Sequence, residues 1–119
     1  MALTPTDLDG YARTDVYEDE TLVRVSVRQT TDAAYPSGWR YTLHYGALVA
    51  DPPETLADGT IRRYDNAHED TRGHDLHVAP DSDPQTIQFP GMVDLYERFW
   101  SEIPKPRFGP SDNGGSSSP

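Results

Sequence analysis

The residues with the greatest capacity for chemistry lie close together in the middle of the chain. Three of the four histidines, His68, His74 and His77, fall within ten residues of one another. The block Arg-Arg-Tyr-Asp-Asn at residues 62–66 precedes them, and His44 falls in an earlier apolar segment. Imidazoles titrate near neutral pH and guanidinium groups bind phosphate, so this set can transfer protons beside a phosphate without a cofactor.

Metal-independent cleavage of RNA needs a base for the ribose 2′-OH, an acid for the leaving 5′-oxygen and cations at the phosphorus. We predict His74 and His77 as the proton-transfer pair, Arg63 as the phosphate clamp and Tyr64 as a stacking or proton-donating group. Because the two histidines are an odd number of residues apart, a regular strand would not put both on one face, so one of them would have to lie in a loop or a bulge. The other predicted RNA contacts are Arg40, His44, Arg62, Asn66 and His68.

Several of these residues also have a purely structural interpretation. Asp65-Asn66 is typical of a turn that ends a strand. Arg62 and Arg63 are adjacent in a predicted strand, so at most one of them enters a site and the other pairs with an acid. The nearby arginines Arg24 and Arg28 either extend an RNA groove or belong to a salt-bridged surface.

Two other functions remain open from the residues alone. His74 and His77, joined by His68, Asp65 or Asp75, supply nitrogen and oxygen ligands for a metal ion, although no His-Glu-x-x-His spacing is present. Alternatively, the acidic surface and an amphipathic C-terminal segment suit a non-enzymatic module that binds a partner protein. The acid–base hypothesis assigns no metal and no cofactor, so activity in the presence of a chelator would separate it from the metal hypothesis.

The charged residues are unusual in type as well as in number. The 119 residues carry a net charge of −10, from 20 acids and 10 bases. Fourteen of the acids are aspartate and nine of the bases are arginine. Many short carboxylates with little lysine indicate a halophilic protein. At ~1 M salt the Debye length is ~3 Å, so the net charge would not keep a polyanion such as RNA away.

Composition also limits the compartment. No apolar run approaches the ~18 residues of a membrane span, and the first residues lack the pattern of a signal peptide. The chain has no cysteine, so neither disulfides nor thiolate metal sites can form. We therefore expect a cytoplasmic protein with no membrane partner.

Periodicity predicts an α+β fold. Apolar and polar residues alternate over 22–30 and 39–49, and weaker patterns predict strands over 60–66, 74–78 and 85–89. Apolar residues recur at helical spacing over 91–103, and prolines follow. The prediction is an antiparallel sheet of about four to five strands packed against a C-terminal amphipathic helix. The expected core residues are Trp39, Tyr41, Tyr45, Tyr96, Phe99 and Trp100.

We predict one domain over residues 16–104. Residues 1–15 form a poorly patterned arm, and residues 105–119 are expected to be a disordered tail rich in Gly, Ser, Pro and Asp. Because such a domain is small, a homodimer would help to bury its apolar surface.

Several segments together resemble the TumE-like family of toxin components from toxin–antitoxin pairs. The resemblance covers roughly residues 20–103. It rests on the Tyr-Thr-Leu-His-Tyr-Gly segment at 41–46, the Arg-Tyr-Asp-Asn block at 63–66, the following histidines and the Phe-Pro-Gly that leads into an aromatic helix. Family members often carry His-His-Lys-His, which His-Asp-Leu-His replaces at 74–77. The resemblance implies action on RNA or translation and a cognate antitoxin of helix-turn-helix type.

Overall fold

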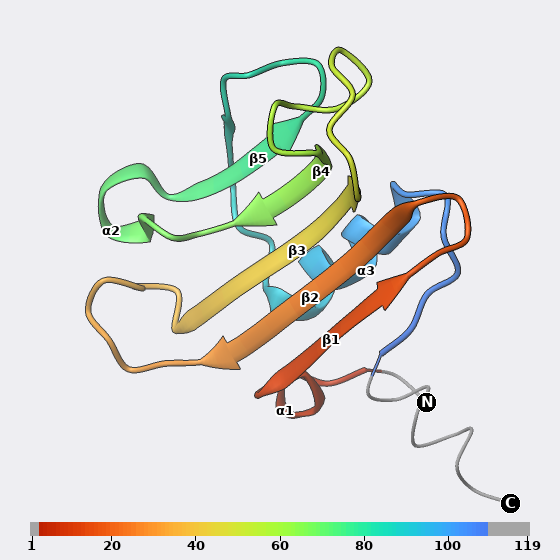
Figure 1. Ribbon diagram of the computed structural model, residues 1–119. Helices are drawn as coiled ribbons and strands as arrows, with labels where there is room; N and C mark the ends of the chain where they lie inside the picture. Colours follow the sequence, from red (N-terminus) through yellow and green to blue (C-terminus); the bar gives the residue numbers. More distant parts are fainter. Residues whose placement is uncertain (1–2, 110–119) are drawn as a thin grey trace, which may run out of the picture.

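Six antiparallel strands cross one sheet in chain order, from β1 to β6 (Figure 1). The computed structural model describes residues 3–109. The strands are β1 (Tyr11–Val16), β2 (Thr21–Gln29), β3 (Trp39–Ala47), β4 (Thr60–Asp65), β5 (His74–Val78) and β6 (Gln85–Ile87). The helices are α1 (Pro5–Leu8), α2 (Glu69–Arg72) and α3 (Met92–Ser101).

The predicted α+β class, with an antiparallel sheet and a C-terminal helix, is confirmed. The sheet has six strands rather than about four to five, because the N-terminal segment adds β1. Apolar alternation does not mark β1: its helix-side residues are Tyr11, Arg13 and Asp15, which pair with three valines of β2. Pairing with an apolar neighbour therefore compensates for the weak pattern of this edge strand.

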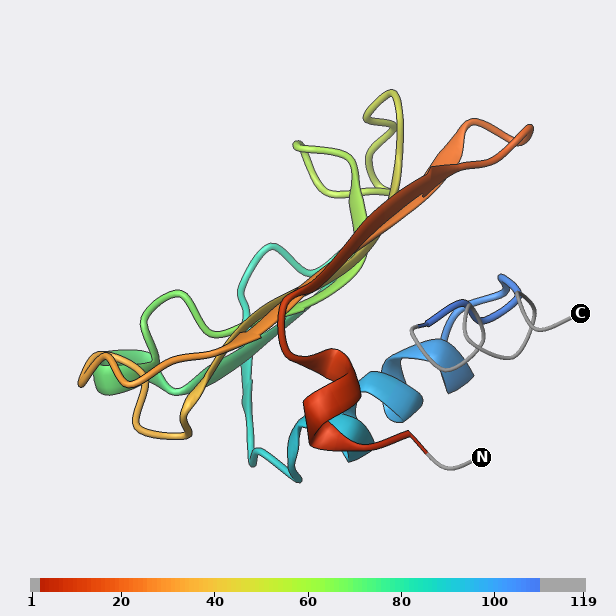
Figure 2. The same cartoon turned by 90° about the horizontal axis from the view of Figure 1, so that it is seen from below.

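The helices α1 and α3 lie on the same face of the sheet, and the connection between β3 and β4 rises from the other face (Figure 2). Because successive side chains of a strand point to opposite faces, each strand contributes one row to the covered face and one to the open face. On β2, for example, Val23, Val25 and Val27 are buried, whereas the alternate Arg24 and Ser26 are exposed. The open face is where polar chemistry can be displayed.

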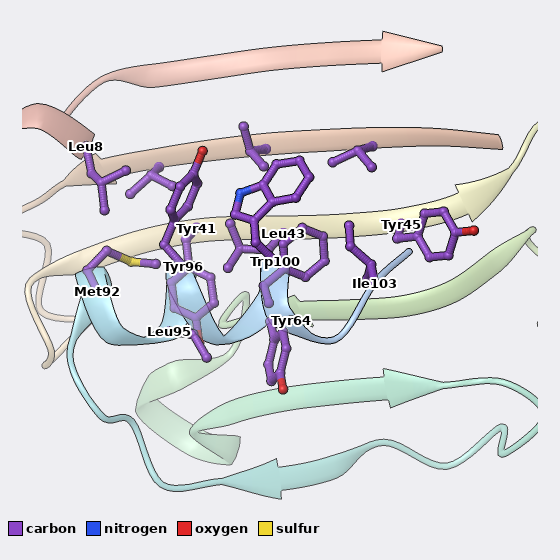
Figure 3. Close-up of a cluster of buried hydrophobic side chains, with 14 of the residues drawn as sticks. Leu8, Tyr41, Leu43, Tyr45, Tyr64, Met92, Leu95, Tyr96, Trp100 and Ile103 are labelled. Carbon is purple, nitrogen blue, oxygen red and sulfur yellow. The ribbon is translucent and has the colours of Figure 1, made fainter. Parts of the chain in front are cut away.

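The core lies between the sheet and α3, and Figure 3 shows Tyr64 from the sheet and Trp100 from the helix among its buried side chains. The rings of Tyr64 and Phe99 meet edge to face, with centroids 6.4 Å apart. Leu43, Tyr96 and Phe99 have no exposed surface. All six predicted aromatic core residues are buried: Trp39, Tyr41, Tyr45, Tyr96, Phe99 and Trp100.

The packed region is wider than the predicted span of 16–104. Leu3 and Leu8, in the segment expected to be an arm, are buried in the core. Beyond the predicted end, Phe108 is buried, and its carbonyl accepts a hydrogen bond from the Tyr96 hydroxyl. Most of the predicted disordered tail, residues 110–119, lies outside the described residues. Within 3–109, no helix has the length and apolar character that a bilayer crossing needs.

Candidate functional site

Strand register assembles one row of cationic and imidazole side chains across the open face. Arg24 on β2 pairs with His44 on β3, His44 pairs with Arg63 on β4, and Arg63 pairs with His77 on β5. Directly opposed residues of an antiparallel pair lie on the same face, with Cβ atoms roughly 5 Å apart. The row therefore places two imidazoles on either side of one guanidinium.

The open face gathers positive charge although the chain is strongly acidic. Its hollow has a volume of about 820 Å³. Five of the ten basic residues and three of the four histidines line it, against two of the twenty acids. The charged and imidazole residues of this lining are Arg24, Arg28, Arg40, Arg63, Arg72, His44, His68, His77, Asp65 and Asp75. Such a surface suits an anionic ligand.

His44 is half-buried beside a glycine that makes room for its ring. A Cβ at Gly46 would lie 2.8 Å from the carbonyl oxygen of Gly59 and would collide with His44 Nε2. Burial, and then the charge of Arg63, lower the pKa of His44 below the ordinary value of 6.5. The ring is therefore held neutral near pH 7, the form that accepts a proton.

Arg63 and His77 share a carboxylate neighbour. Arg63 Nε donates to Asp65 Oδ2 over 2.9 Å, and Arg63 Nη1 lies 3.4 Å from Asp58 Oδ2. His77 Nε2 lies 3.6 Å from Asp65 Oδ2. Both side chains keep some solvent exposure, so they remain accessible from the open face.

The two histidines predicted as a pair do not share a site. Both lie in β5, and alternation sends His74 to the covered face and His77 to the open face. The Phe89 ring stacks on His74 with centroids 4.4 Å apart, and Tyr41 Oη lies 2.7 Å from His74 Nδ1. Neither a loop nor a bulge separates the histidines, so the odd spacing places their rings on opposite faces.

Contacts around His74 belong to a buried polar network. His74 Nε2 lies 3.1 Å from Glu69 Oε1, which also accepts hydrogen bonds from Ser37 Oγ and Asn66 Nδ2. Burial is the largest effect on His74 and lowers its pKa, although Glu69 acts in the opposite direction. A neutral ring satisfies both contacts by accepting from Tyr41 and donating to Glu69. This arrangement ties together β3, α2 and β5.

Two other predicted site residues also face the helix. Tyr64 has no exposed surface, and its hydroxyl donates to Glu102 Oε1 over 2.6 Å. Burial and that hydrogen bond raise the pKa of Tyr64 to about 12. Arg62 Nε lies 3.6 Å from Glu102 Oε1. The expected opposite orientation of Arg62 and Arg63 is confirmed, and neither Tyr64 nor Arg62 reaches the open face.

The remaining predicted RNA contacts divide between surface and interior. Arg40 is exposed on the open face, with its guanidinium 5.6 Å from the centroid of the Tyr35 ring. His68 is exposed at the start of α2. Asn66 is fully buried: its amide donates to the Trp39 carbonyl, and its oxygen accepts from the Tyr41 amide. Asn66 therefore supports the wall of the hollow.

Three further arginines line the hollow: Arg72, for which no role was predicted, and Arg24 and Arg28, whose roles the sequence left open. Arg24 and Arg28 alternate with buried valines on β2, so their face could be expected from the pattern. Their alignment with His44 and Arg40 could not be expected from the pattern, because it depends on strand register. No local pattern marks Arg72, which reaches the hollow from α2.

These features define a small α+β protein with a cationic, histidine-bearing sheet face. A model of the family described as toxin TumE matches residues 2–107, which is most of the chain. The chain belongs to this toxin family, as its sequence resemblance predicted. Membership implies the toxin of a toxin–antitoxin pair, and hence an antitoxin partner. No curated protein and no solved structure matched the chain.

Proposed function

We propose that this toxin acts on RNA through the open face of the sheet, as a metal-independent endoribonuclease. The observation that carries the proposal is the concentration of arginine and histidine on one face of an acidic chain. Phosphate contacts from arginine dominate the binding of nucleic acids. A surface that only kept the protein soluble would not need to separate the charges in this way.

His44 and His77 are the proton-transfer groups of this proposal, and Arg63 lies between them. Neighbouring strands are ~4.8 Å apart, so the two histidine backbones are about 10 Å apart across Arg63. A phosphate bound at Arg63 would place the ribose on one side and the leaving group on the other. In this proposal, His44 and His77 take the place of His74 and His77, the pair predicted from the sequence.

The reaction balances without an added nucleophile. His44 takes the proton of the 2′-OH, and the 2′-oxygen attacks phosphorus while the bond from phosphorus to the 5′-oxygen breaks. His77 donates a proton to the leaving 5′-oxygen, and the products are a 2′,3′-cyclic phosphate and a 5′-hydroxyl. Arg63 stabilises the charge that develops on the phosphoryl oxygens.

Flanking arginines set the path of the strand. Arg24 stands beside His44 in the same row, and Arg28 lies opposite Arg40 nearer the other end of these strands. Four residues along a strand span ~13 Å, so Arg24 and Arg28 can contact different phosphates of one strand. Tyr64 and Arg62 take no direct part, because both face α3.

Cleavage of a mixed-sequence single-stranded RNA in 1 M KCl and EDTA tests this proposal. We expect the wild type to release fragments with 2′,3′-cyclic phosphate ends and to leave 2′-O-methyl RNA intact. His44→Ala and His77→Ala should each lower the rate by ~10²–10⁴-fold, the usual contribution of general acid–base catalysis. Unfolding curves of the same variants should remain close to that of the wild type.

His74→Gln is the matched histidine control, because its ring lies on the covered face. Measured per folded molecule, this variant should cleave as the wild type does. Equal losses in His74→Gln and His77→Gln would contradict the assignment to the open face. An RNA that binds without being cut would rule out the nuclease step and leave a binding module.

We infer a halophilic, cytoplasmic toxin whose antitoxin is of helix-turn-helix type, with a homodimer as a further assembly. The excess of aspartate and the single lysine support the halophilic assignment. Under such salt, screening limits repulsion between RNA and the acidic remainder of the surface.

A further inference from the structure

Two aspartates and a histidine on the open face bring their ligand atoms together. Asp65 on β4 is paired with Asp75 on β5, and His77 follows two residues later on the same face of β5. One ligand atom from each of the three lies within 4.8 Å of the others. The cluster is therefore set by two paired strands, which hold its geometry rigidly.

Asp75 gives an independent reason to expect a ligand there. Its side chain is 6% exposed, and its Oδ1 atom has no hydrogen-bond donor among the described residues. Arg72 Nη2 lies 3.9 Å from that oxygen, which is too far for a hydrogen bond. A buried carboxylate oxygen without a donor is costly unless a cation or another ligand compensates for it.

Contacts among the three residues do not fill their capacity for hydrogen bonds. The 3.6 Å between His77 Nε2 and Asp65 Oδ2 is too long for a good hydrogen bond. Arg63 does bind Asp65 over 2.9 Å and would have to turn away or share that carboxylate. Its guanidinium side chain is 24% exposed, so it has room to turn outward.

We propose that Asp65, Asp75 and His77 bind one divalent transition-metal ion, of the Mn²⁺ or Zn²⁺ type. One imidazole nitrogen with two carboxylate oxygens suits these ions, and three protein ligands leave coordination positions for water or a phosphate oxygen. His74 and His68 do not belong to this set. His74 faces the helix, and His68 is not among the residues whose ligand atoms lie within 4.8 Å of one another.

Binding would affect the proposed ribonuclease in a defined direction. A metal on His77 Nε2 would occupy the nitrogen lone pair and withdraw this group from proton transfer. We therefore expect the bound ion to inhibit metal-independent cleavage. The site itself does not depend on that activity, because binding can be measured without RNA.

Calorimetric titration of EDTA-treated, dialysed protein with MnCl₂ and with ZnCl₂ in 1 M KCl tests the site. One equivalent should bind to the wild type, and Asp75→Asn and His77→Gln should each weaken binding by at least about tenfold. Co²⁺ provides a second readout, because a visible absorption band should appear with the wild type and be lost in both variants. Asp94→Asn, an exposed acid on α3, removes the same charge as Asp75→Asn and should bind as the wild type does.

The outcomes separate the two proposals. Equal binding by all four proteins, or no stoichiometric binding by the wild type, would overturn the metal site and leave the ribonuclease hypothesis standing. Stoichiometric binding lost in both ligand variants would establish the site. If cleavage then required the ion instead of being inhibited by it, the metal-independent mechanism would be wrong while the site remained.

Discussion

His74 and His77 lie three residues apart on β5, yet one faces the helix and the other faces the open hollow. On the covered face, the imidazole of His74 stacks on Phe89 and lies within hydrogen-bonding distance of Glu69. On the open face, His77 stands next to Arg63, with solvent on one side. Similar side chains close in sequence can therefore serve opposite purposes, depending on which face of the strand they occupy.

The arginines of β4 show the same division. Arg62 lies on the covered side near Glu102 at the end of α3. Arg63 points away from α3, and in the proposed reaction its guanidinium exchanges Asp58 or Asp65 for a phosphate. We infer that the covered face uses charge to join the sheet to the helix, while the open face keeps its charge available for a ligand.

The strongest test of this division compares two adjacent positions of β4. Tyr64→Ala should lower the free energy of unfolding by about 3–5 kcal/mol, because it empties a fully buried aromatic site. Arg63→Ala should change it by less than about 1 kcal/mol, since partly exposed ion pairs contribute little. Urea unfolding measures both values. Comparable losses at the two positions would mean that the open face contributes to the stability of the fold as much as the covered face does.

A smaller effect is expected from acid at His74, on the covered face. The pKa of His74 in the folded state is lowered below its unfolded value of 6.5, mainly by burial. The folded state then binds fewer protons than the unfolded state, so this contribution is complete above about pH 6.5 and is lost as the pH falls through the folded pKa. Glu69, whose pKa is also lowered, acts in the same direction below its ordinary value of 4.5.

His74→Gln isolates that contribution. At pH 7.5 this variant should lose roughly 1–3 kcal/mol of stability, because Tyr41 and Glu69 lose partners in the network. Between pH 7.5 and 5.5 its stability should fall less steeply than that of the wild type. Unfolding curves of the wild type and His74→Gln at both pH values check this. Parallel slopes in the two proteins would remove His74 as the acid-sensitive group.

Hydrophobic pattern was enough to predict most of the fold. Regular alternation marked β2 and β3, and helical spacing marked α3, because each buries a continuous apolar face. The same method missed β1, whose inward residues include Arg13 and Asp15. Periodicity detects a strand through its own apolar residues, so it cannot detect one that relies on the valines of its neighbour.

The candidate site was less predictable, since it depends on register. Clustering in sequence drew attention to residues 62–77, but it could not assign these residues to one face of the sheet or the other. His44 became a partner of Arg63 because β3 and β4 pair in one particular register. A shift of β4 by one residue would have turned Arg63 to the covered face, away from His44. The residues of the row come from four strands, and no local spacing connects them.

The smallest expected effect concerns long-range binding of RNA. Arg24→Gln on the open face and Arg98→Gln on α3 remove the same charge from opposite sides of the sheet. Each phosphate contact with a single strand contributes ~0.7 to the slope of log K against log salt concentration. Arg24→Gln should therefore reduce the slope by about that amount, whereas Arg98→Gln should leave it unchanged.

Fluorescence anisotropy with labelled single-stranded RNA across a series of KCl concentrations measures these slopes. Both arginine variants are measured in a His77→Ala background, which should bind RNA without cutting it. Turnover then does not distort the binding curves. Equal slopes for the two arginine variants would show that RNA does not distinguish the faces. A larger change for Arg98→Gln would move the binding surface to α3, where Arg98 lies 5.6 Å from the centroid of the Tyr64 ring.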